Sequence, residues 1–310
     1  MRRIDLVHMA LLLGALLLAY LLPFELFVLS YAVLGPAHYL TEISWLHDRK
    51  YYLPDRSVAL MLALTALGAM FIASAFWLGL LVLFTFAVCA ILATIHRPLH
   101  VLLLLAAAVV GFLLLSRDNL PFGLAWVLVP TLIHVSLFTL IFMVLGAYRA
   151  KSAAQFALVG LYVLANAAIL VFPPSRATVV PGLAKIGSEY FGDIAPALGS
   201  VLGLPHLGFD GRITGLLSFA YTYHYLNWFI KAEVIRWTAI PKPRLVAIAA
   251  LSLAATGLYF YSYTYSFMVL LALSLAHVLL EFPLNAIAIR DLGRALRRDH
   301  IAPIRRRATS

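Results

Sequence analysis

The 310-residue sequence is poor in cysteine and in charged side chains. Its single cysteine, Cys89, excludes an intramolecular disulfide, a four-cysteine zinc site and an iron–sulfur cluster held by this chain alone. Charged residues make up 12% of the chain and hydrophobic residues 64%, whereas a soluble domain has about 25% and about 45–50%. Mean hydropathy is +0.97. The shortage of charge therefore places the chain among integral membrane proteins.

The net charge of +10 does not indicate a nucleic-acid partner. The basic residues flank apolar stretches and do not gather into the basic face of a soluble domain. The expected partners are membrane lipids. The first apolar stretch, from about Ile4 to Leu22, is followed by no small-residue cleavage site and runs into a second stretch. We therefore expect the first helix itself to direct the chain to the inner (plasma) membrane.

Ten stretches are long enough to cross a bilayer, because a transmembrane helix needs about 20 mostly apolar residues. They predict an all-α, polytopic helical bundle over residues 1–292, with short joints at Pro23, Trp77-Leu78-Gly79 and Pro98. The predicted spans cover residues 4–22, 24–46, 57–77, 78–96, 99–116, 121–148, 153–172, 212–237, 244–263 and 265–290.

The distribution of basic residues predicts the orientation of this multi-pass bundle. With both termini in the cytoplasm, 18 of the 23 Lys and Arg residues lie in inside segments and four in outside segments. The longest connection, residues 172–211, is then extracytoplasmic. Within it, residues 186–202 form either a helix on the membrane surface or an ordered cap. The basic tail, residues 293–310, either binds anionic headgroups or stays disordered.

Ionisable side chains inside the apolar stretches are the main functional signal. Such groups are costly at membrane depth unless paired or solvated, so each one is a functional hypothesis. His38 and Glu42 are four residues apart, as are His277 and Glu281, so each pair shares one helix face. Imidazoles and carboxylates together form a ligand set for a divalent transition metal. These pairs therefore indicate a metal centre or a proton relay between transmembrane helices.

Two further stretches carry buried histidines of their own. His224 begins a polar stripe with Asn227 and Lys231, and His134 lies in a separate span. At a rise of 1.5 Å per residue, the histidines reach overlapping depths near the middle of the membrane. One site can therefore collect them. His134 is equally consistent with a hydrogen-bonded packing residue, and Lys231 with a side chain that reaches toward the interface.

His96 and His100 form a different feature at a predicted helix junction on the cytoplasmic side. They bracket Arg97 and Pro98, and proline disturbs the helical geometry that a spacing of four would otherwise give. Both histidines are candidate metal ligands, and a pair at headgroup level is the alternative.

Aromatic residues run along the predicted helix that carries His224. Tyr221, Tyr223 and Trp228 form either an interfacial belt or the wall of a tunnel for a hydrophobic substrate. We take Tyr221 and Tyr223, together with Asn227, as residues that support the metal ligands from behind.

The order and spacing of these groups resemble the Brp/Blh family of membrane β-carotene 15,15′-dioxygenases. Residues 35–42 (GPAHYLTE) are similar to the family's Gly-x-Pro-His motif with an acid four residues on, with Glu42 in place of Asp. Residues 277–281 (HVLLE) are similar to its last motif, a His followed closely by an acid.

Two other family motifs are matched in part. Residues 96–100 (HRPLH) are the nearest match to His-x-x-x-Asp, with His100 in place of the acid. Residues 219–224 (FAYTYH) match the aromatic lead into His-x-x-x-His, but Trp228 stands where the second His is expected. His134 is the candidate to replace that missing ligand.

The resemblance implies oxygen-dependent cleavage of a carotenoid double bond at a ferrous centre held by histidines. It implies a lipophilic substrate such as β-carotene and an Fe²⁺ cofactor, with another divalent transition metal as the alternative. Glu42 and Glu281 are then the catalytic carboxylates, which either bind the metal or orient the histidine rings. The expected ligands are His38, His134, His224 and His277, with His96 and His100 as further candidates.

Three other interpretations of the same groups stay open. The first is a proton- or metal-coupled transporter that uses the buried His, Glu and Lys side chains, although a carrier should show related halves or interrupted helices. The second is another lipid-modifying membrane metalloenzyme, and the third is a helical protein whose polar groups only hold helices together. The sequence does not predict the oligomeric state.

Overall fold

A computed structural model describes residues 3–49, 56–69, 71–72, 75–115, 132–175, 179–183, 185, 211–231, 236 and 238–307. This part of the chain contains helices and no strands, as predicted. The helices are α1 (Arg3–Leu21), α2 (Pro23–Leu29), the π-helical segment η1 (Ser30–Leu34), α3 (Gly35–Arg49), α4 (Arg56–Ala69), α5 (Ala75–Thr94), α6 (Pro98–Leu115), the π-helical segment η2 (Ile133–Phe138), α8 (Thr139–Ala150), α9 (Ala153–Val171), α12 (Gly211–Ile230), α14 (Lys242–Tyr261) and α15 (Tyr263–Arg307).

Each of the ten predicted spans overlaps at least one of these helical segments, and the membrane class is confirmed. The number of ten crossings stays a prediction, because α4 has only 14 residues. In the described residues, seven helical stretches are long and apolar enough to cross a membrane: Ile4–Leu21, Pro23–Arg49, Trp77–Thr94, Ile133–Ala150, Ala153–Val171, Lys242–Tyr261 and Val269–Arg297.

Prolines mark two of the helix starts, as predicted. Pro23 and Pro98 each occupy the first position of a helix, where the missing N–H and the fixed φ are favourable. The predicted joint at Trp77-Leu78-Gly79 is wrong. Helix α5 begins at Ala75 and runs through these residues, because a single Gly without a proline does not end an apolar helix.

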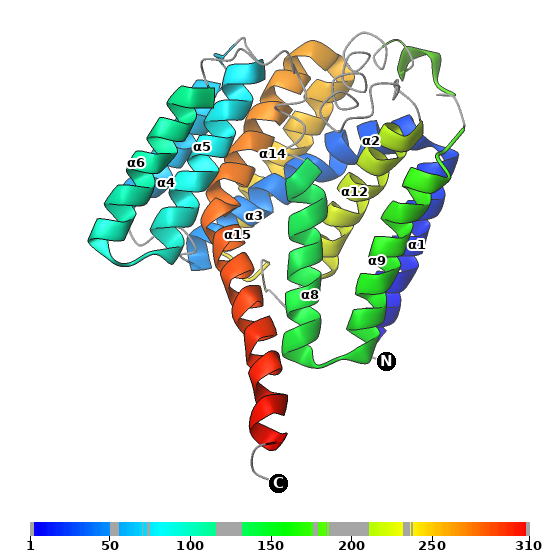
Figure 1. Cartoon of the computed structure of the whole chain (residues 1–310). Helices are drawn as coiled ribbons and strands as arrows, with labels where there is room; N and C mark the ends of the chain where they lie inside the picture. The colour runs from blue at the N-terminus through cyan, green and yellow to red at the C-terminus, as the bar shows by residue number, and fades with distance from the viewer. Residues whose placement is uncertain are drawn as a thin grey trace.

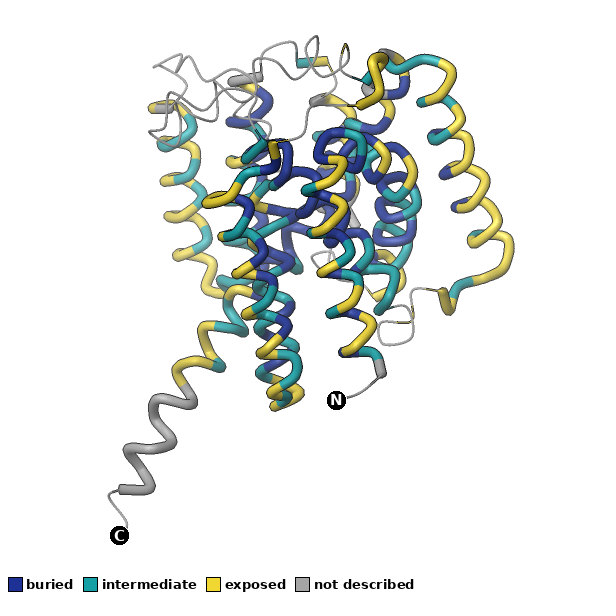
Figure 2. Tube along the Cα trace, turned by 90° about the vertical axis from the view of Figure 1, so that its right-hand side faces the viewer, coloured by how far each residue is buried: buried dark blue, intermediate teal, exposed yellow. Residues whose placement is uncertain are grey.

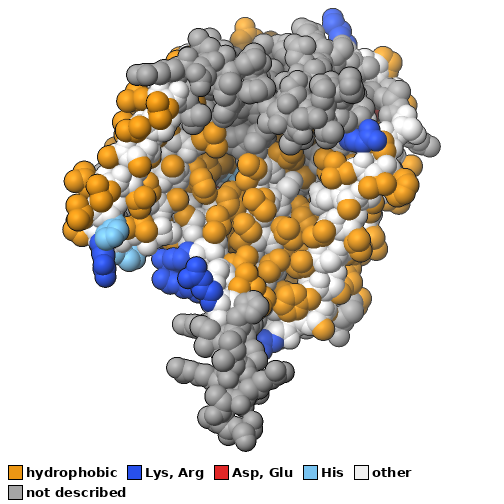
Figure 3. Space-filling view, in the orientation of Figure 1, with side chains coloured by type: hydrophobic (Ala, Val, Ile, Leu, Met, Phe, Trp, Pro, Cys, Tyr) orange, Lys and Arg blue, Asp and Glu red, His pale blue; other side chains and the backbone are white. Residues whose placement is uncertain are grey.

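Helix α15 runs through the bundle and contacts α3, α4, α5, α8 and α14, while α12 packs on α1, α2 and α9 (Figure 1). Buried segments lie in the middle of the bundle and exposed ones on its outer faces (Figure 2). Apolar side chains cover much of the described part of the face seen in Figure 3. Leu102, Leu164 and Leu253 are 65%, 67% and 73% exposed. Such a surface suits contact with lipid and not with water.

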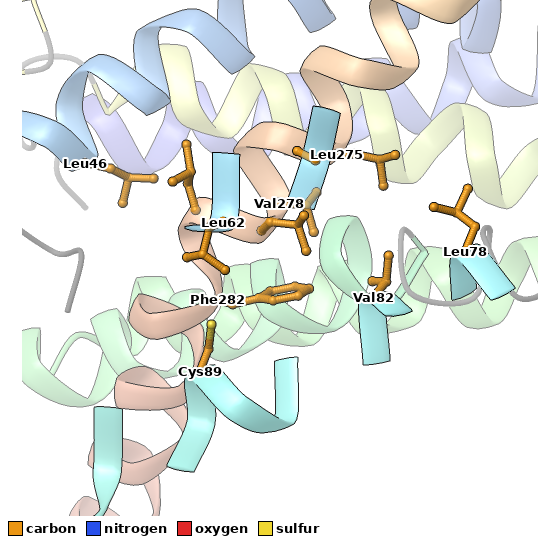
Figure 4. Packing of buried hydrophobic residues seen from close by; sticks show 11 residues of the cluster. Leu46, Leu62, Leu78, Val82, Cys89, Leu275, Val278 and Phe282 are labelled. Atoms are coloured by element: carbon orange, nitrogen blue, oxygen red, sulfur yellow. The ribbon is translucent and has the colours of Figure 1, made fainter. Parts of the chain in front are cut away.

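An apolar cluster fixes the rotation of α15. Val278 and Phe282 of α15 pack against Leu62 of α4 and against Val82 and Cys89 of α5. Figure 4 shows these side chains gathered between the helices. Residues one position away along α15, His277 and Glu281, therefore point to another side of the helix, toward the centre of the bundle.

Helix α1 begins, and α15 ends, at the same end of the bundle (Figure 1). This arrangement suits the prediction that both termini share one compartment, but which side of the membrane they occupy stays a prediction. The basic tail predicted from residue 293 continues α15 as a helix to Arg307. The surface helix predicted at residues 186–202 lies outside the described residues.

Candidate metal centre

Four imidazole rings form a closed circuit in the middle of the bundle. They come from four elements: His38 from α3, His134 from η2, His224 from α12 and His277 from α15. Ring centroids lie 4.7 Å apart for His38–His224, 5.1 Å for His224–His134, 5.0 Å for His134–His277 and 5.3 Å for His277–His38. The four histidines that the sequence suggested for one site therefore lie together in the bundle, and their binding of a metal stays a prediction.

Most of the side chains in and beside the circuit are buried. His38, His134 and His277 are 0%, 1% and 2% exposed, while His224 is partly buried. Glu42 and Glu281 are also buried, at 3% and 4%. Six ionisable groups thus share one apolar interior, where unpaired polar groups are costly.

The nitrogen positions fit a bound metal ion. His38 Nε2 lies 3.1 Å from His224 Nε2, and His277 Nε2 lies 3.2 Å from His134 Nε2. Two nitrogens bound to one ion at about 2.0–2.1 Å are about 2.9 Å apart at a right angle and about 3.4 Å apart at the tetrahedral angle. The two contacts fall between these limits. His38, His224 and His277 also bring one ligand nitrogen each within 4.8 Å of the other two, so this triad could hold a metal ion.

Two of the rings have a polar group beside the nitrogen that faces away from the centre, and of these two contacts only that of His224 has the geometry of a hydrogen bond. Glu281 Oε2 lies 3.1 Å from His134 Nδ1, and the Thr139 hydroxyl lies 2.8 Å from His224 Nδ1. Metal-binding histidines usually have such a partner on the second nitrogen, which fixes the ring and the tautomer. The carboxamide of Asn285 in turn donates to Glu281 at 3.4 Å.

Glu42 has a different position. Its Oε2 lies 3.0 Å from His38 Nε2, the same nitrogen that faces His224. Glu42 therefore lies on the side of the circuit where a metal would bind, whereas Glu281 approaches His134 from behind. The spacing of four predicted two equivalent His–Glu pairs, but the structure gives the carboxylates unequal positions.

Local backbone irregularity places two of the site residues. His134 belongs to η2, and η1 ends directly before α3, which carries His38. π-Helical turns inside helices are rare and frequently occur at functional sites. The composition of residues 133–138 does not predict a π-helical turn.

The supporting residues predicted on α12 occupy different surroundings. Asn227 is buried, at 8% exposed, and follows His224 by three residues on α12. Tyr221 packs edge-on against Phe27 and Tyr31, with centroids 5.3 and 6.0 Å apart. Tyr223 stacks on Phe219 and contacts Tyr162 of α9. These two tyrosines thus pack α12 against its neighbours, and none of these ring contacts involves a histidine of the circuit.

His96 and His100 do not join the circuit. His96 lies between α5 and α6, His100 in the first turn of α6, and both side chains are exposed. Figure 3 shows histidine and basic side chains together at this end of the α5–α6 pair. Their exposed position agrees better with the alternative, a histidine pair at headgroup level. Pro98 starts α6 between them, so this turn lies at the end of the bundle.

Three contacts of the site were not predicted. They are the Thr139 hydroxyl on His224, the stacking of Tyr39 on His277 at 4.3 Å, and the indole of Trp228 at 5.5 Å from the ring of His38. Tyr39 also hydrogen-bonds to Tyr225 at 2.6 Å. Contacts between segments that lie far apart in the sequence leave no local pattern, so the sequence alone did not indicate them.

Comparison with known proteins gives no relative: no model of a protein family, no curated protein and no solved structure matches this chain. The resemblance to the Brp/Blh family therefore rests on the motifs alone.

Proposed function

We propose that this chain is a membrane-embedded metalloenzyme that uses dioxygen to cleave a lipophilic substrate such as β-carotene, with iron as its metal. The circuit of four imidazoles, three buried and one partly buried, is the observation that carries the proposal. Desolvation of four imidazoles and two carboxylates would be costly for helix packing alone. A divalent cation at their centre would compensate that cost.

His38, His134, His224 and His277 would hold the metal, with Glu42 as the carboxylate nearest to it. Nitrogen and oxygen ligands without a thiolate suit iron and related transition metals. Cys89 is buried in the separate apolar cluster with Phe282. When bound, iron supplies the redox chemistry by which dioxygen attacks a carbon–carbon double bond.

The residues of the chain supply orientation and exclude water. Thr139 hydrogen-bonds to the ring of His224, and Glu281 lies within ion-pair distance of the ring of His134, each at the nitrogen that faces away from the centre. Tyr39 covers the ring of His277. The apolar helices around the site keep bulk water away and border the bilayer, from which a lipophilic substrate would come.

Metal analysis of the purified, full-length protein tests the proposal first. We expect about one equivalent of a transition metal, as for a site whose ligands are pre-arranged. His277→Ala should lose it, and His100→Ala, which alters an exposed histidine, should retain it. A metal-free protein with full activity would contradict the proposal.

Expression in carotenoid-producing bacteria tests the substrate. We expect the cells to bleach and to release an apocarotenal, whereas the His277→Ala variant leaves the pigment unchanged. Unchanged pigment with the metal bound would favour another lipid-modifying metalloenzyme.

A further inference from the structure

An apolar groove of about 400 Å³ opens on the lipid-facing side of the bundle, between α3, the end of α12 and α14. Helix α14 is the outermost of the three, and Leu253 on it is 73% exposed. The groove therefore opens to the bilayer and not to water. Its apolar lining includes Val33, Ala37, Phe229, Ile248, Ala249 and Leu253.

The three hydroxyl groups of the groove are already used within the protein. Thr41 donates to the carbonyl of Ala37 at 2.7 Å, Ser252 to that of Ile248 at 2.8 Å, and Thr256 to that of Ala32 at 3.0 Å. Since these donors are taken, the three hydroxyl groups offer no free O–H to an oxygen atom of a ligand. A plain hydrocarbon fits this lining.

The cation beside the groove is also paired. Arg244, which precedes the groove residue Leu245, donates to both carboxylate oxygens of Asp48 at 2.7 Å. A fatty acid or phospholipid would have to compete with Asp48 for this guanidinium. A molecule without a polar head avoids that competition.

Trp228 lies between the groove and the imidazole circuit. Its indole N–H donates to Thr41, a groove residue, at 3.0 Å. Its ring lies edge-on to His38 at 5.5 Å and to Trp45 at 5.5 Å. One side chain, held by one hydrogen bond, thus contacts both the groove and a candidate ligand.

We propose that this groove admits a linear isoprenoid hydrocarbon from the bilayer, and that Trp228 is the gate between the groove and the imidazole circuit. The choice of an isoprenoid rests on the proposed function. The groove and its gate rest on the contacts above.

Photolabelling of the full-length protein in liposomes tests the groove. A trace of a diazirine-bearing isoprenoid hydrocarbon is activated by light, and the labelled residues are mapped by mass spectrometry. We expect the label to concentrate on groove residues of α3 and α14, and excess β-carotene to reduce it at least several-fold. Ala249→Trp, which fills the groove, should remove it. Ala254→Trp, on an exposed position of α14 outside the groove, should retain it.

Two results would overturn this assignment. Label spread evenly along α14 and unaffected by Ala249→Trp would show that the groove holds no site. Competition by palmitate equal to that by β-carotene would show a general lipid groove. Metal content is measured on the same samples, so a specific label without metal supports the groove and counts against the proposed function alone.

Removal of the indole tests the gate. In Trp228→Ala we expect the label to appear also on residues of α3 and α12 around His38. In Trp77→Ala, which removes a partly exposed indole from α5, the label should keep its original distribution. A Trp228→Ala protein that elutes as the native species with an unchanged label distribution would overturn the gate.

Discussion

The ring of Tyr39 stacks on the imidazole of His277 with centroids 4.3 Å apart and planes inclined by 23°. Gly35 lies one helical turn before Tyr39, and a Cβ atom on it would come within 3.1–3.2 Å of the Tyr39 ring. The glycine of the GPAH segment thus leaves space for the tyrosine that covers the ring of His277 in the candidate metal centre. Its role is packing against a ring, and no unusual backbone angle is involved.

Gly35→Ala should therefore destabilise the protein by about 1–3 kcal/mol, the usual cost of overpacking a tight core. It should also weaken metal binding, because Tyr39 must shift away from its place over His277. Thermal unfolding in detergent and a metal titration measure the two effects. Gly14→Ala is the matched control, since a Cβ there meets nothing within 4 Å and alanine favours the helix. Equal stability of the two variants would contradict the packing role.

His134→Ala should remove the metal even though the resemblance to the family assigns no ligand at this position. Its Nε2 lies 3.2 Å from that of His277, and Glu281 orients the ring from behind. Elemental analysis of the purified variant is the measurement, with circular dichroism to verify the helical content. If His134→Ala keeps a full equivalent of metal, the site is the triad of His38, His224 and His277 alone.

The sequence predicted the class of fold and the four histidines that gather in the bundle because both depend on local chemistry. A long apolar stretch must be a helix in a membrane, and a histidine within it must find a partner. The His and the Glu of each His-x-x-x-Glu pair share a face because residues four apart lie on the same side of a helix. His96 and His100 have the same spacing, yet Pro98 starts a new helix between them and leaves both exposed.

What the sequence could not provide is the pairing between helices. Thr139 contacts His224 across 85 positions, and Trp228 contacts Thr41 across 187. No period or spacing within one helix encodes such contacts. The difference between Glu42 and Glu281 has the same origin, because it depends on which nitrogen of which histidine each carboxylate meets.

Thr139→Val should lower metal affinity about 10–100-fold, the usual effect of removing the partner that orients a metal-binding histidine. Valine keeps the shape of threonine but cannot hydrogen-bond to His224 Nδ1. Thr139→Ser restores the hydroxyl and should restore most of the affinity. Competition with a chelator of known affinity provides the measurement. A Thr139→Val protein with wild-type affinity would show that packing alone orients His224.

Cysteine labelling should decide how α9 crosses the membrane. This helix has 19 residues, so it spans about 28 Å, close to the thickness of the hydrocarbon core. Exposed Lys151 precedes it, and Val179, which is 65% exposed, follows it at the other end.

The native Cys89 is 0% exposed, so an impermeant maleimide should leave the wild-type protein unlabelled. The positive-inside distribution predicts that Val179→Cys reacts in intact cells and that Lys151→Cys reacts only after the cytoplasmic face is opened. The reverse pattern would invert the orientation, and reaction of both from one side would show that α9 does not span the bilayer.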